Sequence, residues 1–251
     1  MAGEAVQKRL AGLLAEVGSE ALEQNPSDRA LGERDAGGFF LRKKPLEGIA
    51  SADSNSDFAL SPRQLELFGA YYELFVRWNE RINLSAIRDE EGILRRHFLE
   101  SIGCARLLPK GVETLLDFGS GGGFPGVPVA ICRPGIAVTL AESQGKKAAF
   151  LQEAVRVLGL NARVHSARAE TLGRVFDCVT LRAVDRMEMA VTAATGLVRP
   201  GGTLALMTTR VDFGALAAAA GKGFLWGPVV TLPGSERGIL ALGRREPGSA
   251  E

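Results

Sequence analysis

The feature that most constrains the fold is a glycine-rich segment, Gly-Ser-Gly-Gly-Gly-Phe-Pro-Gly at residues 119–126, directly after an apolar run at 114–118. Glycines at the end of a strand let the backbone approach a ligand closely, because no Cβ occupies that space. Further apolar runs alternate with helix-patterned segments downstream, at residues 137–142, 162–165, 178–181 and 203–208. This alternation predicts a doubly wound α/β fold with a parallel sheet. Residues 228–232 and 238–242 flank a Pro-Gly-Ser turn, which predicts an antiparallel hairpin at the sheet edge.

Two helices are expected before the strands. Ser61-Pro62 is typical of a helix start, and a second helix is expected from about Glu90 to Leu108. Apolar side chains recur at spacings of three and four in both segments. We therefore expect a helical cap over residues 58–111, ahead of an α/β domain over 112–251.

Residues 1–57 differ from the rest of the chain, because they hold more acidic than basic residues. Within this segment, apolar residues show helical spacing only at Leu10, Leu13, Leu14, Val17 and Ala21. A Gly-Gly pair and a polar run come after them. We predict a poorly ordered N-terminal extension with a short helix at most.

The composition narrows the possible classes of protein. The formal net charge of +1 neither favours nor excludes binding to nucleic acid. Three widely spaced cysteines argue against a disulfide scaffold and against a CxxC metal site, so no metal is expected. No apolar run approaches the ~20 residues of a membrane span, and the N-terminus does not resemble a secretory signal. We expect a soluble cytoplasmic protein with no membrane partner.

Two carboxylates and a proline indicate the kind of ligand that the glycine segment binds. Asp117 places a negative charge where it would repel a pyrophosphate, and Pro125 removes an amide that a phosphate cradle would use. The second strand ends in Glu142, where an acid can bind the ribose hydroxyls of an adenosine. S-adenosylmethionine fits the carboxylate beside the loop and the ribose-binding acid, because it is a cationic adenosine derivative that carries no phosphate. The alternative is an NAD-linked oxidoreductase, since Gly121-x-Gly123-x-x-Gly126 also satisfies the dinucleotide fingerprint.

Residues 117–128, Asp-Phe-Gly-Ser-Gly-Gly-Gly-Phe-Pro-Gly-Val-Pro, resemble the donor loop of a known family. The family is that of the bacterial small-subunit (16S) rRNA guanine-N7 methyltransferases, first named glucose-inhibited division protein B. Further blocks resemble it in the same order, at residues 83–88, 96–101, 142–151 and 176–183. The resemblance runs from about residue 60 to the C-terminus, and residues 1–57 do not resemble the family core.

The resemblance implies a class I SAM-dependent methyltransferase. Its fold would be a Rossmann-like, seven-stranded, mostly parallel sheet with an antiparallel C-terminal hairpin and an N-terminal helical cap. The implied methyl donor is S-adenosyl-L-methionine, and the implied partner is 16S rRNA or the small ribosomal subunit, methylated at N7 of one guanine. The residues expected to bind the donor are Asp117, Gly119, Gly121, Phe124, Glu142, Ala169, Glu170 and Arg182.

Methylation at guanine N7 needs no general base, because N7 carries a lone pair and no proton. No catalytic side chain is therefore assigned, and the expected task is in-line positioning of the two reactants. Arg182 is expected to contact either the donor carboxylate or the guanine. Phe124 and Phe98 are candidates for stacking on the base, although Phe98 also fits the core. His97 is expected to be a structural histidine.

Several basic residues are candidates for binding rRNA phosphates: Arg88, Arg95, Arg96, Lys146 and Lys147. Acidic residues alternate with the arginines of the cap, so a solvated charged face is the alternative. Residues 206–210, Leu-Met-Thr-Thr-Arg, stand where the family has Ala-Leu-Lys-Gly. If that lysine contacts RNA, Arg210 must reach to replace it. The departure also admits a third hypothesis, a non-catalytic rRNA-binding or assembly factor on a methyltransferase fold.

Overall fold

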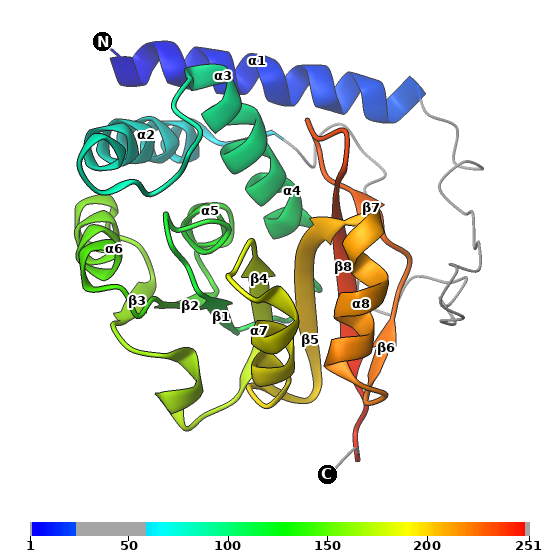
Figure 1. Cartoon of the computed structure of the whole chain (residues 1–251). Helices are drawn as coiled ribbons and strands as arrows, with labels where there is room; N and C mark the ends of the chain where they lie inside the picture. Colours follow the sequence, from blue (N-terminus) through cyan, green and yellow to red (C-terminus); the bar gives the residue numbers. More distant parts are fainter. Residues whose placement is uncertain (1, 24–58, 249–251) are drawn as a thin grey trace.

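A computed structural model describes residues 2–23 and 59–248 of the chain (Figure 1). The helices ahead of the sheet are α1 (Ala2–Glu23), α2 (Pro62–Ile82), α3 (Glu90–Gly92), the π-helical η3 (Ile93–Leu99) and α4 (Glu100–Leu107). The α/β part begins with β1 (Thr114–Phe118), α5 (Gly126–Cys132), β2 (Ala137–Ala141), α6 (Gly145–Leu158), β3 (Ala162–His165) and η4 (Ala169–Leu172). It continues with β4 (Phe176–Arg182), α7 (Met187–Thr195), β5 (Val198–Thr209), α8 (Arg210–Ala220), β6 (Phe224–Trp226), β7 (Val230–Thr231) and β8 (Gly238–Arg245).

The sheet has the topology of a class I methyltransferase. Within the described residues its eight strands follow the order β3-β2-β1-β4-β5-β8-β6, and β7 pairs with β8 beside this path. Strands β1 to β5 are mutually parallel, whereas β8 runs antiparallel to β5, β6 and β7. The predicted fold class is confirmed. The strand order reverses between β1 and β4, so the loops after these strands meet at the edge where doubly wound folds bind ligands.

The C-terminal hairpin is present, but its strands differ from the prediction. β7 is limited to two residues, and the position beside β8 in the sheet path belongs to β6. Sequence reasoning missed β6 because three residues are too short to show a strand periodicity. Gly243 of β8 makes room for the Trp226 ring of β6, since a Cβ there would lie 2.9 Å from Cζ3. Close backbone approach thus explains the pairing of β6 with β8.

Alternate side chains of the sheet enter two different cores, as expected for strands with both faces covered. In β1, Leu115 belongs to the core beneath α2, α4, α5 and α6, whereas Leu116 packs with α7 and α8 on the other face (Figure 1). The predicted second helix is present as α3, η3 and α4 in direct succession. Its apolar side chains share the first core with the sheet, so the cap rests directly on the α/β part.

The N-terminal helix α1 was not expected at its observed length. The prediction of a poorly ordered extension over residues 1–57 does not hold for 2–23, and residues 24–57 lie outside the described part of the chain. Val6, Leu10, Leu13 and Leu14 are buried in the first core, because they fall on one helical face that packs on α2 (Figure 1). The Gly3 amide also donates to Glu73 Oε1 at 2.7 Å. The apolar spacing was visible in the sequence, but its partner surface on α2 was not.

A core substitution in α1 tests this packing. Leu10 is fully buried, so we expect Leu10→Ala to lower the free energy of unfolding by about 2–5 kcal/mol. Urea unfolding followed by circular dichroism measures the change. Lys8→Ala, on the exposed face of the same helix, is the control and should change stability by less than about 0.5 kcal/mol. Equal stability of Leu10→Ala and the wild type would show that α1 does not contribute to the core.

Candidate functional site

The glycine segment forms the loop between β1 and α5, at the edge where the strand order reverses. Gly119 has a φ of +71°, a conformation that glycine adopts without strain. Gly126, at the start of α5, is required for a different reason. A Cβ at this position would lie 2.3 Å from Leu140 Cδ2 and 2.7 Å from Asp117 Oδ2. The loop can therefore pass close to β1 and β2 only with glycine at residue 126.

Asp117 lies beneath this loop, and its side chain is bonded within the protein. Oδ2 accepts a hydrogen bond from the Gly126 amide at 3.2 Å, and Oδ1 accepts one from Thr180 Oγ1 of β4 at 2.9 Å. Burial raises the pKa of this carboxyl to about 6, although hydrogen bonds from Thr180, Ser120 and Gly126 oppose the increase. Asp117 thus positions the loop, and a direct contact between its carboxylate and a cationic ligand stays a prediction.

Glu142 follows β2 and joins two loops at the same edge of the sheet. Its Oε2 accepts from the Gly121 amide at 2.9 Å, and its Oε1 accepts from the Gln144 amide at 2.7 Å. The neighbouring Ala169 is buried after β3, whereas Glu170 is exposed. The β2–β3 pairing brings Ala141 and His165 together, so the turns after both strands lie at one edge. Glu142 and the Ala169-Glu170 segment thus follow two neighbouring parallel strands, and their binding of an adenosine stays a prediction.

An aromatic cluster joins the cap to the glycine loop. Phe124 of the loop stacks on His97 of η3 with ring centroids 4.6 Å apart, and it also packs against Tyr71 and Phe98. The Tyr71 hydroxyl of α2 donates to the Gly122 carbonyl at 2.5 Å. Phe98 is fully buried and Phe124 is 9% exposed. The proposed stacking of these two rings on a nucleobase is therefore not supported, because other aromatic rings already cover them.

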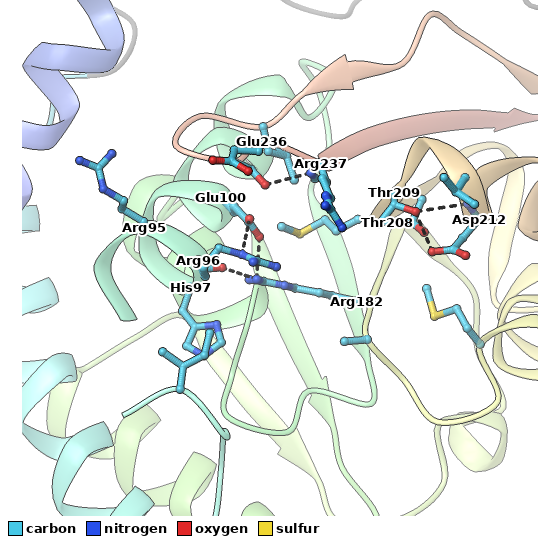
Figure 2. Close-up of a pocket in the computed structure, with 18 of the residues that line it drawn as sticks. Arg95, Arg96, His97, Glu100, Arg182, Thr208, Thr209, Asp212, Glu236 and Arg237 are labelled. Atoms are coloured by element: carbon cyan, nitrogen blue, oxygen red, sulfur yellow. Dashed lines mark hydrogen bonds and ion pairs between the residues drawn. The ribbon is translucent and has the colours of Figure 1, made fainter. Parts of the chain in front are cut away.

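An open cleft of about 1420 Å³ lies beyond the carboxyl ends of β4 and β5, between the cap, α7, α8 and the turn before β8 (Figure 2). Arg182, the last residue of β4, lines it. Its Nη2 donates to Glu100 Oε2 at 2.7 Å and to the Arg96 carbonyl, and its Nη1 lies 3.4 Å from Ser101 Oγ. Arg96 Nε reaches the other oxygen of the same carboxylate at 3.1 Å. Glu100 therefore fixes two arginines at the junction of cap and sheet.

The cleft and the glycine loop are neighbours through Val184, which follows β4. A Cβ on Gly119 would lie 3.1 Å from Val184 Cγ2, so the loop backbone touches this side chain. Ala183, between Arg182 and Val184, lines the cleft and has a φ of +48°. The segment after β4 thus separates the loop from the cleft by little more than one side chain. A ligand bound at the loop and a second molecule in the cleft would meet here.

His97 is neutral and faces the cleft. Burial, followed by the charges of Arg182 and Arg96, lowers the pKa of His97 to about 3. Its Nε2 lies 2.8 Å from Ser85 Oγ, and within the described residues its buried Nδ1 has no hydrogen-bond partner. The Ser85 contact and the Phe124 stacking agree with the predicted structural role. The unpartnered Nδ1 is a feature that the sequence did not indicate.

The five predicted RNA-binding residues do not form one patch. Arg95 and Arg96 line the cleft, whereas the Arg88 guanidinium donates to the Asn79 carbonyl and to Asn83 Oδ1 at the C-terminal end of α2. Lys146 and Lys147 lie in the first turn of α6, away from the cleft. The solvated-face alternative fits Arg88, since its guanidinium is already engaged. Binding of RNA by any of the five residues stays a prediction.

The segment 206–210 does not bring Arg210 into the cleft. Thr208 and Thr209 line it, whereas Arg210 begins α8 and lies 3.4 Å from Thr231 Oγ1 of β7. The hypothesis that Arg210 replaces a family lysine is therefore not supported by its position. Sequence reasoning missed Arg186 and Arg237, which do line the cleft. They follow β4 and precede β8, so only the sheet topology brings them together.

The model of the family described as "GidB: rRNA small subunit methyltransferase G" matches residues 64–219, which hold the loop, Arg182 and most of the cleft. The chain belongs to this family. A ribosomal RNA small subunit methyltransferase G from Roseiflexus castenholzii is 42% identical over 196 residues, 73% of this chain and 84% of that protein. The enzyme so named from Stenotrophomonas maltophilia (strain K279a) is 45% identical over 164 residues, 64% of this chain and 74% of that protein.

A third member of the GidB family, from Roseiflexus sp. (strain RS-1), is 46% identical over 150 residues, 57% of this chain and 64% of its own length. The match with that relative thus spans less than two thirds of it. Among solved structures, a predicted O-methyltransferase from Agrobacterium tumefaciens has a TM-score of 0.48 and 22% identity, covering 61% of this chain and 80% of that one. The family model leaves α1 outside its limits.

Across 2–23 and 59–248, no three His, Cys, Asp or Glu side chains are grouped so as to hold a metal ion. In the same residues, every helix is too short or too polar to cross a bilayer.

The pH dependence of stability tests the position of Asp117. Because its folded-state pKa of about 6 lies above the usual 3.8, its contribution to stability is full below about pH 4 and is lost as the pH rises through 6. The separation of the two values corresponds to about 3 kcal/mol. We expect Asp117→Asn to remove this decline relative to wild type, measured by urea unfolding between pH 4 and 7. Thr180→Ser, which keeps the hydroxyl donor, should retain the decline. An unchanged slope in Asp117→Asn would contradict the buried position.

Proposed function

We propose that this chain transfers a methyl group from S-adenosylmethionine to N7 of a guanine in 16S rRNA, on the small ribosomal subunit in the cytoplasm. The observation that carries the proposal is Arg182, which lies at the floor of a cleft directly beside the glycine loop of a class I sheet. Membership of the GidB family supports the same reaction. The neighbouring loop and cleft provide places for a donor and for a large substrate.

The loop suits a donor without phosphate. Pro125 has no amide hydrogen, the Gly126 amide donates to Asp117, and the Val127 amide donates to the Gly123 carbonyl. The first turn of α5 therefore offers no free amide to a pyrophosphate, which argues against the NAD-linked alternative. Glu142 and the turn after β3 would bind the adenosine, and the Gly119 backbone would contact the donor. When bound, the donor supplies the electrophilic methyl group.

The reaction requires positioning and no proton transfer. The N7 lone pair forms the new bond to the methyl carbon while the carbon–sulfur bond breaks, so the positive charge moves from sulfur to the purine. No base is needed, and the pKa of His97, lowered by burial to about 3, agrees with this because so weak a base accepts no proton near neutral pH. The residues of this chain hold the guanine in line with the methyl group, an effect worth up to about 7–11 kcal/mol in favourable cases.

Arg182 is suited to bind guanine without blocking N7. A free arginine usually binds guanine through O6 and N7 together, which would occupy the nucleophile. Here Nη2 is engaged by Glu100 and the Arg96 carbonyl, so the guanidinium cannot present both of its terminal nitrogens to the base. A single hydrogen bond to O6 would orient the base and leave N7 free. This favours the guanine over the donor carboxylate as the partner of Arg182.

The direct test is methyl transfer to small subunits that lack the modification. Purified protein is incubated with labelled S-adenosylmethionine and such 30S subunits, and the methylated base is then mapped. Label at N7 of a single 16S guanine is the expected result. Donor binding by calorimetry without transfer to subunits or to free 16S rRNA would contradict the proposed substrate. RNA binding without donor binding would support the assembly-factor hypothesis instead.

A conservative substitution tests the role of Arg182. Lysine keeps the charge but cannot bind Glu100 and the guanine through one planar fork. We expect Arg182→Lys to lower kcat/KM for the subunit at least tenfold, as loss of a charged hydrogen bond worth about 1.5–3 kcal/mol would do. Donor affinity by calorimetry should stay within about twofold. Arg199→Lys, at the opposite end of the sheet where it bonds Asp177, is the control and should leave both quantities unchanged.

A further inference from the structure

The helix α1 lies outside the residues that the GidB family model matches, yet two of its charged side chains reach the rim of the cleft. Arg9 and Glu16 are about two helical turns apart and so lie on one side of α1. Opposite them, Glu91 and Arg95 are one turn apart, and both line the cleft. In Figure 2 the Arg95 side chain extends toward α1 and away from Arg182.

These four side chains form a closed ring of alternating charge. Arg9 donates to both carboxylate oxygens of Glu91. Its Nη2 lies 3.1 Å from Oε1 and 3.0 Å from Oε2, and its Nε lies 3.2 Å from Oε2. Glu91 Oε1 also accepts from Arg95 Nε at 2.5 Å. Glu16 closes the ring at 3.7 Å from Arg95 Nη2 and 3.9 Å from Arg9 Nη1. The two cleft residues are therefore each paired with an opposite charge from α1.

The ring is open to solvent and to competing ions. The side chains of Arg95 and Glu91 are 36% and 44% exposed, so each of these ion pairs contributes little to stability and can exchange with ions from solvent. Arg96 and Arg182 differ, because they share the nearly buried carboxylate of Glu100 within the family core. Of these three cleft arginines, Arg95 is the one whose charge is balanced by a residue of α1.

We propose that α1 sets the affinity of the cleft for RNA, because Glu16 competes with RNA phosphates for Arg95 while Arg9 neutralises Glu91. Arg9 and Glu16 are positioning residues in this scheme, and they act through the two cleft residues. The inference rests on the proposed function, since it takes RNA to be the molecule in the cleft. Loss of Glu16 leaves the rim one charge more positive, and loss of Arg9 leaves it one charge more negative.

Substitutions that remove one charge each give opposite expectations at the two positions. We expect Glu16→Gln to tighten binding of a 16S rRNA transcript about threefold to tenfold at low salt and Arg9→Gln to weaken it to a similar extent. One additional phosphate contact steepens the slope of log affinity against log salt by about 0.7–0.9, so the slope should rise in Glu16→Gln. The double variant should return near the wild type. In the transfer assay KM should move with affinity, while kcat stays constant.

The same helix offers matched controls. Glu4 and Lys8 pair with each other at 3.6 Å on the exposed face, with side chains 70% and 80% exposed. Glu4→Gln and Lys8→Gln change the net charge of the protein as the test variants do, but away from the cleft. Thermal unfolding should show that all variants keep α1 folded, because only exposed pairs are removed.

The controls decide the outcome. Unchanged RNA affinity in Glu4→Gln and Lys8→Gln, with opposite shifts in Glu16→Gln and Arg9→Gln, would support the role of α1. Equal shifts in test and control variants would show an effect of net charge alone and would overturn the inference, as would no shift in any variant. A wild type that binds and methylates RNA normally in those cases would leave the proposed function intact. A wild type that binds no RNA would refute the proposed function itself.

Discussion

A buried, hydrogen-bonded carboxylate holds three elements of the site in register. Asp117 of β1 accepts from Thr180 of β4 and from the first amide of α5, so one side chain sets both the strand pairing and the path of the glycine loop. The arrangement has a cost, because burial raises the pKa of the carboxyl to about 6 and disfavours its charged form. The close approach of the loop to β1 at Gly126 depends on this arrangement.

Two kinds of buried contact join the cap to the sheet. On the loop side, stacked rings and the Tyr71 hydroxyl join α2 and η3 to the glycine segment. On the cleft side, Glu100 joins the cap to β4 through Arg182. Breaking a buried ion pair at one partner is far costlier than losing an exposed pair. The difference explains why charges on α1 can tune the cleft, whereas the Glu100 pair defines its shape.

Local patterns predicted the parts of the fold that depend on periodicity. The apolar run before Gly119 and the repeated strand-helix alternation were sufficient for β1 to β5, and Ser61-Pro62 located the start of α2. α1 was underestimated because its apolar stripe gains stability mainly from α2, a surface distant in sequence. Phe124 was proposed to stack on a nucleobase because its ring partners were not visible, whereas its expected contact with the donor stays a prediction. Arg186 and Arg237 were missed since they reach the cleft from separate loops.

The hydrogen bond from Tyr71 to Gly122 has a consequence for ligand binding. Gly122 lies in the loop assigned to the donor, and α2 is continuous in packing with η3, whose Arg95 and Arg96 line the cleft. If a bound macromolecule displaced the cap, this hydrogen bond would displace the loop proposed for the donor as well. Two sites joined in this way share a coupling free energy, which acts equally in both directions. If a ligand in the loop raised the affinity of the cleft by some factor, a ligand in the cleft would raise the affinity of the loop by the same factor.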